Sequence, residues 1–396
     1  VQPPDGNHLE ESGGDGGMIK RTLQELCLNI TDGKHGDCEN EENSGYYFIS
    51  CKDIFDGQIN YKNARQITKA DFEETHKRTM LEVDDILLTN SGTIGRMAFV
   101  TDREATTKTT FQKSVAIIKP DKQNVLPRYL YYQLQNCVPQ FINSSNGSAQ
   151  KNLLLSTMRT FQIEIEENCE KQEKIANTLS AYDDLIENNQ KQIKLLEEAA
   201  QRLYKEWFVD LRFPGHENTK IVDGVPEGWS RGLLKELISV NYGKDHKKAP
   251  DDGNIPVYGS GGLMRKCNKS LFSGEAVLIP RKGSLNNIMY VDETFWTVDT
   301  MFYATMKQPH TAIFVYFFVK AFDMYSMNIG AAVPSMTTKI LDAMDVVIPD
   351  KETLEKFDKL TKTYFNKIKT LQGQNERLKI ARDLLLPKLM SGEVEV

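Results

Sequence analysis

Residues Ile175 to Trp207 read IANTLSAYDDLIENNQKQIKLLEEAAQRLYKEW, and this stretch decides the fold. Its seam alternates in steps of four and three residues, through Ile175, Leu179, Tyr182, Ile186, Asn189, Ile193, Leu196, Ala200, Leu203 and Trp207. Charged residues such as Lys191 and Glu198 fall outside the seam. A heptad pattern sustained over this length predicts a long helix that packs along a partner helix. Asn189 either fixes the register of that packing or is a polar residue tolerated near solvent.

A second, weaker stripe of the same kind lies near the C-terminus. It comprises Leu354, Phe357, Tyr364, Ile368, Leu371, Leu378 and Leu385. Three polar residues interrupt it, Thr361, Asn375 and Arg382, and Gly373 lowers its helix propensity. Because each stripe needs an apolar partner and the chain supplies two, we expect the two helices to pack on each other. At about 1.5 Å per residue, helices of roughly 35 to 40 residues would span about 55 Å.

The sequence also matches itself, which indicates an internal repeat. At an offset of 185 residues the first stripe falls on the second, with Ile175 on Leu360 and Ile186 on Leu371. At an offset of 191 residues, the run Asp85–Gly92 falls on Ala276–Gly283. Each half therefore reads as a strand-rich domain followed by a long helix.

The globular parts predict an α+β fold with two β-rich mixed domains. Short apolar runs bounded by Gly, Pro, Asn and Asp predict strands at Ile86–Leu88, Met97–Val100, Val115–Ile118 and Ala276–Ile279. Helices are expected near Pro127–Leu134 and Ala312–Phe322. The expected boundaries are a tag or disordered leader over residues 1–17, a first domain over 18–165, a helical spacer over 166–208, a linker over 209–228, a second domain over 229–350 and a second helical spacer over 351–396.

The composition predicts a folded cytoplasmic protein without a membrane segment. Hydrophobic residues make up 40% of the chain, which is enough for real cores, and the longest apolar run, Ala312–Val319, is too short to cross a bilayer. Six cysteines without a Cys-x-x-Cys pair argue against a disulfide framework and a zinc site. The net charge is −6, but residues 18–165 carry 18 basic and 18 acidic groups. Such a balanced domain can bind DNA if its cations gather on one face.

The sequence contains no recognisable arrangement for catalysis. It has no Gly-x-x-x-x-Gly-Lys phosphate loop, no Asn-Pro-Pro-Tyr-type methyltransferase motif and no Gly-x-Ser-x-Gly. Its six histidines never stand at metal-ligand spacing. Asp350 and Glu352 loosely resemble nuclease carboxylates, but they open the second helix, where acids favour the helix dipole. We therefore expect no catalytic residue, no metal site and no cofactor in this chain.

Three groups of residues suit contacts with DNA, because Arg and Lys match guanine edges or phosphates and Asn, Gln and Ser can read adenine or phosphate. The first group follows a strand in each half and comprises Asn90, Ser91, Thr93 and Arg96, then Arg281, Lys282, Ser284, Asn286 and Asn287. The second is a polar loop with Ser148, Gln150 and Lys151. The third is basic, with Lys34, His35, Lys244, Lys247, Lys248, Arg265 and Lys266. Ordinary polar turns, a solvated loop and a solvated charged face are the respective alternatives.

The order of these motifs resembles the specificity subunit of type I restriction–modification systems. The resemblance covers Met18 to Val396. It rests on SGTIGR at 91–96 after a strand, GSAQKNL at 147–153, KQEKIA at 171–176, VPEGW at 225–229 and LMSG at 389–392. One departure is Asn286 at the position that matches Gly95, so that we expect the second loop to have a different shape.

The resemblance implies two target-recognition domains, related by a pseudo-twofold axis and separated by an antiparallel two-helix coiled coil. Each would read one half of an asymmetric, bipartite target in double-stranded DNA. The implied partners are two modification subunits that methylate adenine with S-adenosylmethionine, and restriction subunits that are ATP-dependent translocases and nucleases requiring Mg. The residues alone leave two alternatives: a coiled-coil interaction protein whose globular ends bind protein or carbohydrate, and an enzyme with an unrecognised site. Salt-dependent binding to a duplex separates the first alternative from a DNA reader.

Overall fold

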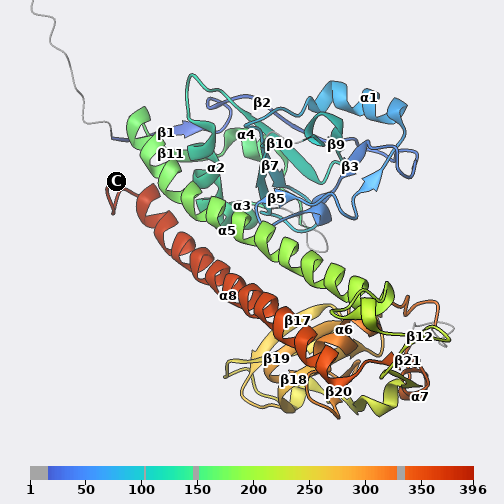
Figure 1. The fold of residues 1–396 in the computed structure, drawn as a ribbon. Helices are drawn as coiled ribbons and strands as arrows, with labels where there is room; N and C mark the ends of the chain where they lie inside the picture. The colour runs from blue at the N-terminus through green and yellow to red at the C-terminus, as the bar shows by residue number, and fades with distance from the viewer. Residues whose placement is uncertain (1–16, 102–103, 146–150, 328–334) are drawn as a thin grey trace, which may run out of the picture. The chain divides into compact units, whose positions relative to one another are not determined.

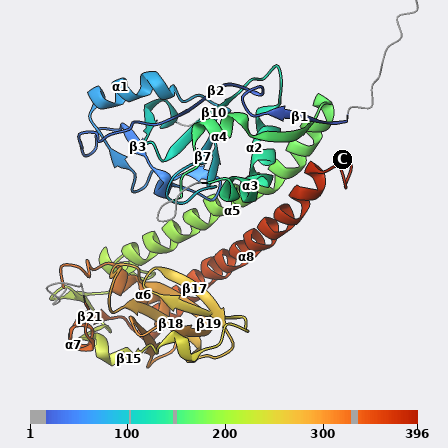
Figure 2. The same cartoon turned by 180° about the vertical axis from the view of Figure 1, so that it is seen from behind.

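The computed structural model describes residues 17–101, 104–145, 151–327 and 335–396, and the chain forms two compact units (Figures 1 and 2). Unit 1 comprises the chain up to Glu187 together with Asn375–Val396, and unit 2 comprises Asn188–Gln374. Each unit therefore holds one strand-rich part and a stretch of both long helices. Each unit is a group of residues that contact one another in the folded chain. The boundaries expected from the sequence instead mark changes of secondary structure. Most of the expected leader lies outside the described residues.

Unit 1 contains a central four-stranded sheet and three smaller ones. Its strands are β1 (Met18–Thr22), β2 (Cys27–Asp32), β3 (Tyr47–Ile49), β4 (Ile54–Phe55), β5 (Gln58–Ile59), β6 (Arg65–Gln66), β7 (Ile86–Thr89), β8 (Met97–Phe99), β9 (Thr109–Phe111), β10 (Val115–Pro120) and β11 (Gln162–Glu166). The sheet orders are β2-β10-β7-β8, β6-β3-β9, β1-β11 and β4-β5, and only the pair β3 and β9 is parallel among these described strands. Its shorter helices are α1 (Lys69–Thr79), α2 (Pro127–Asn136), α3 (Val138–Asn143) and α4 (Leu155–Thr160).

The central sheet of unit 1 is buried on both faces. Along β10, Ala116 and Ile118 belong to one core, whereas Val115 and Ile117 belong to another on the opposite face. A strand covered on both sides needs apolar residues at every position, which explains why its sequence is a continuous apolar run and not an alternating one. Helix α2, predicted from the sequence and started by Pro127, packs in the first of these cores through residues such as Tyr129.

Unit 2 is built around a six-stranded sheet. Its strands are β12 (Ile221–Val222), β13 (Val225–Pro226), β14 (Ser230–Leu233), β15 (Ile238–Tyr242), β16 (Ile255–Gly259), β17 (Gly262–Cys267), β18 (Phe272–Pro280), β19 (Met289–Thr297), β20 (Met301–Met306) and β21 (Asp345–Ile348). The sheet orders are β15-β20-β18-β19-β16-β17, β14-β21 and β12-β13, with β16 parallel to β19. The shorter helices are α6 (Ala312–Lys320) and α7 (Thr338–Asp342). Helix α6 is apolar on nearly every side because it is buried on nearly every side.

The segment 209–228, expected to be a linker, contains the strand pair β12 and β13 and belongs to unit 2. Phe213 is buried, and its ring centroid lies 4.8 Å from that of Trp229. The Trp229 indole Nε1 in turn donates a hydrogen bond of 2.9 Å to Asp350. The segment is therefore fixed to the start of the last helix.

The long helices are α5 (Cys169–Tyr204) and α8 (Lys351–Met390), and in unit 1 the first half of α5 lies beside the last turns of α8 (Figures 1 and 2). Leu179 shares a core with Leu389. Two of the polar residues that interrupt the second stripe have partners here. Arg382 pairs with Asp183, and Asn375 Nδ2 lies 3.5 Å from the carbonyl oxygen of Ile186. Because numbering rises along α5 as it falls along α8, these stretches run in opposite directions.

In unit 2 the second half of α5 packs with the first half of α8 and with α6. The α-helix ends at Tyr204, and a short π-helix over Lys205–Val209 carries Trp207 into the core. On α8 the buried row passes through Thr361, whose Oγ1 donates to the carbonyl oxygen of Phe357 at 2.8 Å. Leu360, which the offset of 185 residues places in the seam, is instead 45% exposed. Asn189 is only 8% exposed, which excludes the alternative of a polar residue near solvent.

Candidate nucleic-acid interface

The loops that follow β7 and β18 are anchored in the same way. In unit 1 the Asn90 N–H donates to the carbonyl oxygen of Ser114 at 3.1 Å, and the Asn90 carbonyl accepts from the Leu153 N–H at 2.8 Å. In unit 2 the Arg281 N–H donates to Thr300 at 2.8 Å, and the Arg281 carbonyl accepts from the Met336 N–H at 2.9 Å. Asn90 and Arg281, which are 191 residues apart, therefore begin two loops with matching backbone support.

Each loop contains a glycine with left-handed backbone two residues after the loop begins. Gly92 has φ of 79° and Gly283 has φ of 85°. The loops differ three residues further on, as expected from the sequence. Gly95 has φ of 93°, whereas Asn286 is not left-handed. Asn286 instead bridges to Asp323 through Nδ2 at 3.0 Å. The second loop is therefore shaped and held differently in its second half.

The side chains of these loops differ in how exposed they are. Thr93 and Arg96 are exposed in unit 1, as are Lys282 and Ser284 in unit 2. The Arg281 guanidinium lies over the Tyr242 ring, 5.6 Å from its centroid, and donates to the carbonyl oxygen of Asp299 at 3.2 Å. Arg281 is therefore held over an aromatic face at the surface of unit 2.

Two of the predicted loop residues are hydrogen-bonded to other groups of unit 2. Asn286 is bound at both ends, because its Oδ1 also accepts from the Met324 N–H at 2.8 Å. Asn287 Nδ2 donates to the carbonyl oxygen of Ser260 at 2.9 Å. Both amides support the loop, and a contact with a base would require them to give up these bonds.

The predicted basic residues Lys34 and Lys244 occupy matching places but differ in their surroundings. Each follows a glycine packed closely against another stretch of backbone, since a Cβ on Gly33 would lie 1.9 Å from the Phe111 carbonyl oxygen and a Cβ on Gly243 would lie 2.0 Å from that of Val298. Lys34 Nζ lies 3.0 Å from Asp71 and 3.1 Å from Glu74, and these hydrogen bonds raise the pKa of its ammonium. Lys244 is exposed.

The remaining predicted residues are spread over both units. Arg265 is held by Asp251 and by the carbonyl oxygen of Ala249, the latter at 2.7 Å, so that it supports the fold. Among these remaining residues, Lys151, Lys247 and Lys266 are exposed. Lys248 lies in the short 3-10 helix His246–Lys248. Ser148 and Gln150 lie outside the described residues.

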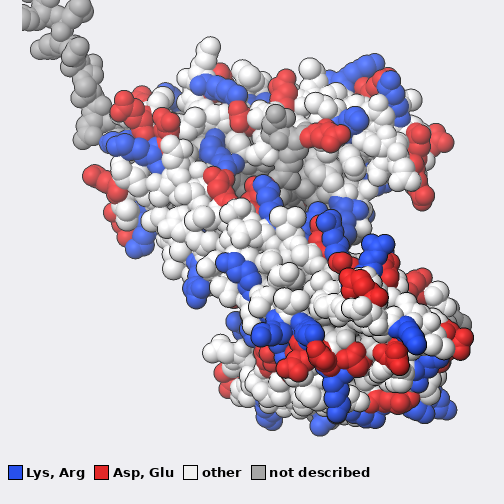
Figure 3. Space-filling view, viewed as in Figure 1, with Lys and Arg blue, Asp and Glu red and all other residues white. Residues whose placement is uncertain are grey.

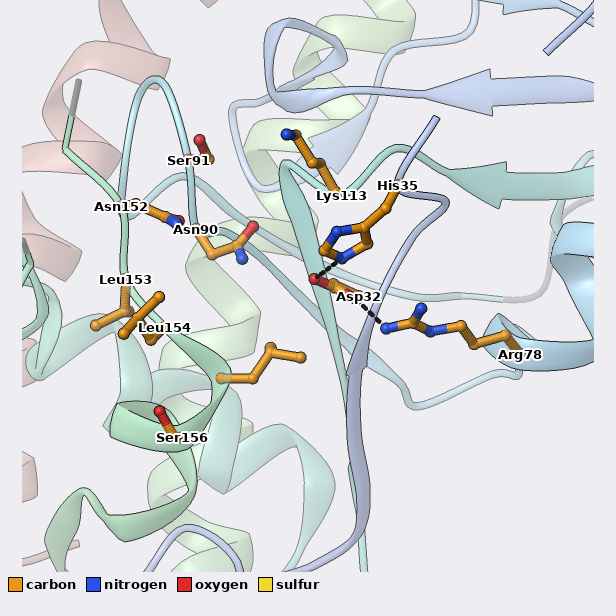
Figure 4. A pocket seen from close by; sticks show the side chains of 11 residues that line it. Asp32, His35, Arg78, Asn90, Ser91, Lys113, Asn152, Leu153, Leu154 and Ser156 are labelled. Carbon is orange, nitrogen blue, oxygen red and sulfur yellow. Dashed lines mark hydrogen bonds and ion pairs between the residues drawn. The ribbon is translucent and has the colours of Figure 1, made fainter. Parts of the chain in front are cut away.

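A cavity of about 550 Å³ in unit 1 brings several polar side chains together (Figure 4). Predicted residues from two groups line it, namely Asn90, Ser91 and His35. It is also lined by Asp32, Arg78, Lys113, Asn152, Leu153, Leu154, Leu155 and Ser156, none of which was predicted. Arg78 stands on α1, a helix without a clear apolar stripe, and Lys113 is a single cation in a turn, so that the sequence held no signal for either.

The Asp32 carboxylate organises one wall of this cavity. It is buried, forms an ion pair with Arg78, and lies 2.9 Å from His35 Nε2. Arg78 Nε also donates to Thr31 Oγ1 at 3.3 Å. Opposite this wall, Asn90 points into the cavity (Figure 4) with only 4% of its surface exposed.

Elsewhere the charge pattern is mixed. On the face shown in Figure 3, basic and acidic side chains are interspersed over the strand-rich part of each unit. Within the described ranges, no group of three His, Cys, Asp or Glu side chains is placed to hold a metal ion. In that same part of the chain, no helix combines the length and the apolar character needed to cross a membrane.

Comparison with known proteins identifies the family. The family described as type I restriction modification DNA specificity domain matches residues 19–198 and 226–379. The type I restriction enzyme MjaIX specificity subunit of Methanocaldococcus jannaschii is 27% identical over 394 residues, covering 88% of this chain and 87% of the relative. The HindI specificity subunit of Haemophilus influenzae is 23% identical over 377 residues, covering 70% of this chain and 80% of that protein.

A solved structure agrees in fold. The crystal structure of a type I restriction–modification S subunit from M. genitalium superposes with a TM-score of 0.57 at 18% identity, covering 96% of this chain and 98% of that one. The family match spans both strand-rich parts and most of the two long helices. The chain therefore belongs to the type I restriction–modification specificity family, whose members recognise DNA sequence.

Proposed function

We propose that the chain reads a bipartite, asymmetric DNA target, one half with each unit, and does no chemistry itself. The observation that carries this proposal is the pair of loops that begin at Asn90 and Arg281. Their backbones have matching support, but the exposed side chains along them differ, with Thr93 and Arg96 in unit 1 and Lys282 and Ser284 in unit 2. Side chains of different hydrogen-bonding character match different base edges, so that two such readers would prefer different half-sites.

The order of strands supports two related readers. The sheet order β2-β10-β7-β8 in unit 1 has its counterpart in β15-β20-β18-β19 of unit 2. Each unit also has a parallel pair, β3 with β9 and β16 with β19. An antiparallel pair closes each half just before its long helix, β1 with β11 before α5 and β14 with β21 before α8. This agreement favours an internal pseudo-twofold repeat with a target-recognition domain in each half.

The helices favour a rigid antiparallel coiled-coil spacer between the readers. Apolar side chains of α5 and α8 pack together within each unit, and the polar seam residue Arg382 is neutralised by Asp183. Two major-groove readers that meet the same face of a duplex have half-site centres about 34–36 Å, or 10 bp, apart. With half-sites of a few base pairs, the unread gap should be on the order of 5 to 8 bp.

The proposed partners follow from the family. Two modification subunits, carrying S-adenosylmethionine, and ATP- and Mg-dependent restriction subunits would supply the chemistry. The helices offer a surface for docking, because Leu185, Ile380 and Leu384 are apolar side chains that are at least half exposed in unit 1.

The test is selection of binding sites from random double-stranded DNA, with the full chain alone and with the modification subunits of its own system. We expect two conserved blocks of different sequence at one fixed separation. Binding should weaken steeply with salt, since DNA binding releases counterions from phosphates. Absence of sequence preference with and without the modification subunits would overturn the proposal.

A further inference from the structure

The cavity of unit 1 presents hydrogen-bond donors and cations on its polar side. Arg78 and Lys113 are cations, and His35 becomes one when protonated. Asp32 is the one carboxylate among the described residues that line the cavity, and it is already engaged by Arg78 and His35. The lining is therefore suited to a ligand that is negatively charged and rich in acceptors.

Asn90 adds a buried polar side chain to the cavity. Its side chain is more than nine-tenths buried and points into the cavity (Figure 4). Its Oδ1 has no hydrogen-bond partner within the part of the chain that the structure describes. Because an amide oxygen only accepts, a water or another donor would have to complete it, whereas Asn90 Nδ2 is the atom that can donate to an anion in the cavity.

Arg78 is positioned for a ligand by the groups behind it. Asp32 and Thr31 hold its guanidinium from one side, the latter through Nε at 3.3 Å. The side chain nevertheless remains 51% exposed. Because a guanidinium has five N–H donors, the pairs to Asp32 and Thr31 leave others for an anion at the cavity mouth. Asp32 is thus a positioning residue for Arg78 and His35.

Geometry decides which part of DNA can enter. Base edges lie at the floor of a groove, so that a side chain must protrude to read them, and Asn90 is recessed. Phosphates lie on the outside of the duplex and can enter a concave site. We propose that this cavity binds a phosphate group, and that in the DNA complex this group is a backbone phosphate of the half-site read by unit 1. This inference rests on the proposed function.

In this arrangement Arg78 and Lys113 supply the positive charge and Asn90 donates through Nδ2. The contact sets the register of unit 1 on its half-site and carries no sequence information of its own. Asn90 therefore acts as a phosphate contact, and the reading of bases in this half falls to exposed neighbours such as Thr93 and Arg96.

The experiment replaces single backbone phosphates of the selected target by neutral methylphosphonates, and measures binding of the full chain with its modification subunits. The variants are Arg78→Gln, Lys113→Gln and Asn90→Ala, with Lys69→Gln as the matched control. Lys69 is an exposed, ion-paired cation on the same helix as Arg78 but does not line the cavity. Thermal unfolding reports whether Arg78→Gln folds, and Lys113→Gln, an exposed position, tests the same cavity without disturbing Asp32.

We expect one phosphate in the half-site of unit 1 whose neutralisation weakens binding of the wild type and of Lys69→Gln but has no effect on the cavity variants. The slope of log affinity against log salt should fall by about 0.9 for Arg78→Gln and for Lys113→Gln. Cavity variants that keep the full wild-type sensitivity to every phosphate would overturn the inference while sequence-specific binding by the wild type upholds the proposed function. A wild type without sequence preference would overturn both. Binding of inorganic phosphate in the cavity, seen by calorimetry and lost in Arg78→Gln, without any change in DNA binding would assign the site to a free phosphate ligand and overturn the DNA assignment.

Discussion

Arg96 and Arg281 are arginines of the two matching loops, the first in unit 1 and the second in unit 2. Arg96 is exposed at the end of its loop, whereas Arg281 begins the other loop and is held over Tyr242. We expect Arg96→Ala and Arg281→Ala each to weaken specific binding through one half-site only. A lost bidentate base contact should cost about 1–3 kcal/mol, whereas a lost phosphate contact should mainly reduce the salt slope.

The measurement is affinity at moderate salt for the selected target and for targets in which one half-site is scrambled. Arg202→Ala is the matched control, because Arg202 is an 83% exposed arginine on α5 outside both loops. If both loop variants bind every target as tightly as the control does, the assignment of these loops to DNA is wrong.

For single residues, the sequence could predict which residue types stand in the loops. It could not predict the hydrogen bonds and ion pairs that their side chains form. Lys34 is occupied by Asp71, which is 37 residues away, and Asn286 by Asp323, which is also 37 residues away. Such partners are set by tertiary structure and leave no local pattern. Arg78 was missed for the same reason, because it lines one cavity with Asn90 only in the folded chain. The role of each predicted residue in DNA binding stays a prediction.

Among the helices and strands, those with a regular apolar pattern or a continuous apolar run were predicted best. The heptad seam and the continuous apolar runs correspond to α5, β7, β10 and β18. Helix α1 was missed because its sequence KADFEETHKRT contains one large apolar residue, Phe72, so that no stripe forms. Periodicity also treated Thr361 as an interruption, although its hydroxyl bonds within the helix and is fully buried.

The start of α8 gives a prediction at the scale of an element. Asp350 accepts from the Thr353 N–H at 3.0 Å, from Thr353 Oγ1 at 2.7 Å and from Trp229 Nε1 at 2.9 Å. Burial opposes ionisation of this carboxyl, but the hydrogen bonds from Thr353 and Trp229 outweigh it and lower its pKa from the ordinary value of 3.8. Asp350→Ala should therefore reduce the free energy of unfolding near neutral pH by about 1–3 kcal/mol.

The sign of the pH dependence follows from the lowered pKa. The contribution of Asp350 is present above the ordinary carboxyl pKa and is lost as pH falls through the lower value of the folded protein. Urea unfolding of wild type and variant should therefore converge at acidic pH. Glu352→Gln is the control, because Glu352 is 77% exposed in the same first turn, and it should change stability by less than about 0.5 kcal/mol. An equal effect of the two substitutions would show that capping by Asp350 is unimportant.

The whole molecule adds a constraint that neither loop has alone. A reader in each half can select a bipartite target only if the distance between the readers is fixed, and a two-helix spacer can fix it. The sequence predicts this organisation through its two self-matches, at offsets of 185 and 191 residues. It could not indicate how the halves differ in recognition, because the offset of 191 residues matches Asn90 to Arg281 but does not show that Asn90 is buried beside a cavity.

The most direct test of the account removes one heptad from each long helix, residues 186–192 and 371–377. These stretches face each other where Asn375 approaches the Ile186 carbonyl oxygen, so that deleting both keeps the seam in phase. The spacer should shorten by about 10 Å. Binding sites selected from random DNA with the deletion variant should then keep both half-site sequences, with a gap smaller by about 3 bp at 3.4 Å per base pair. A folded deletion variant that selects the original gap would contradict the account.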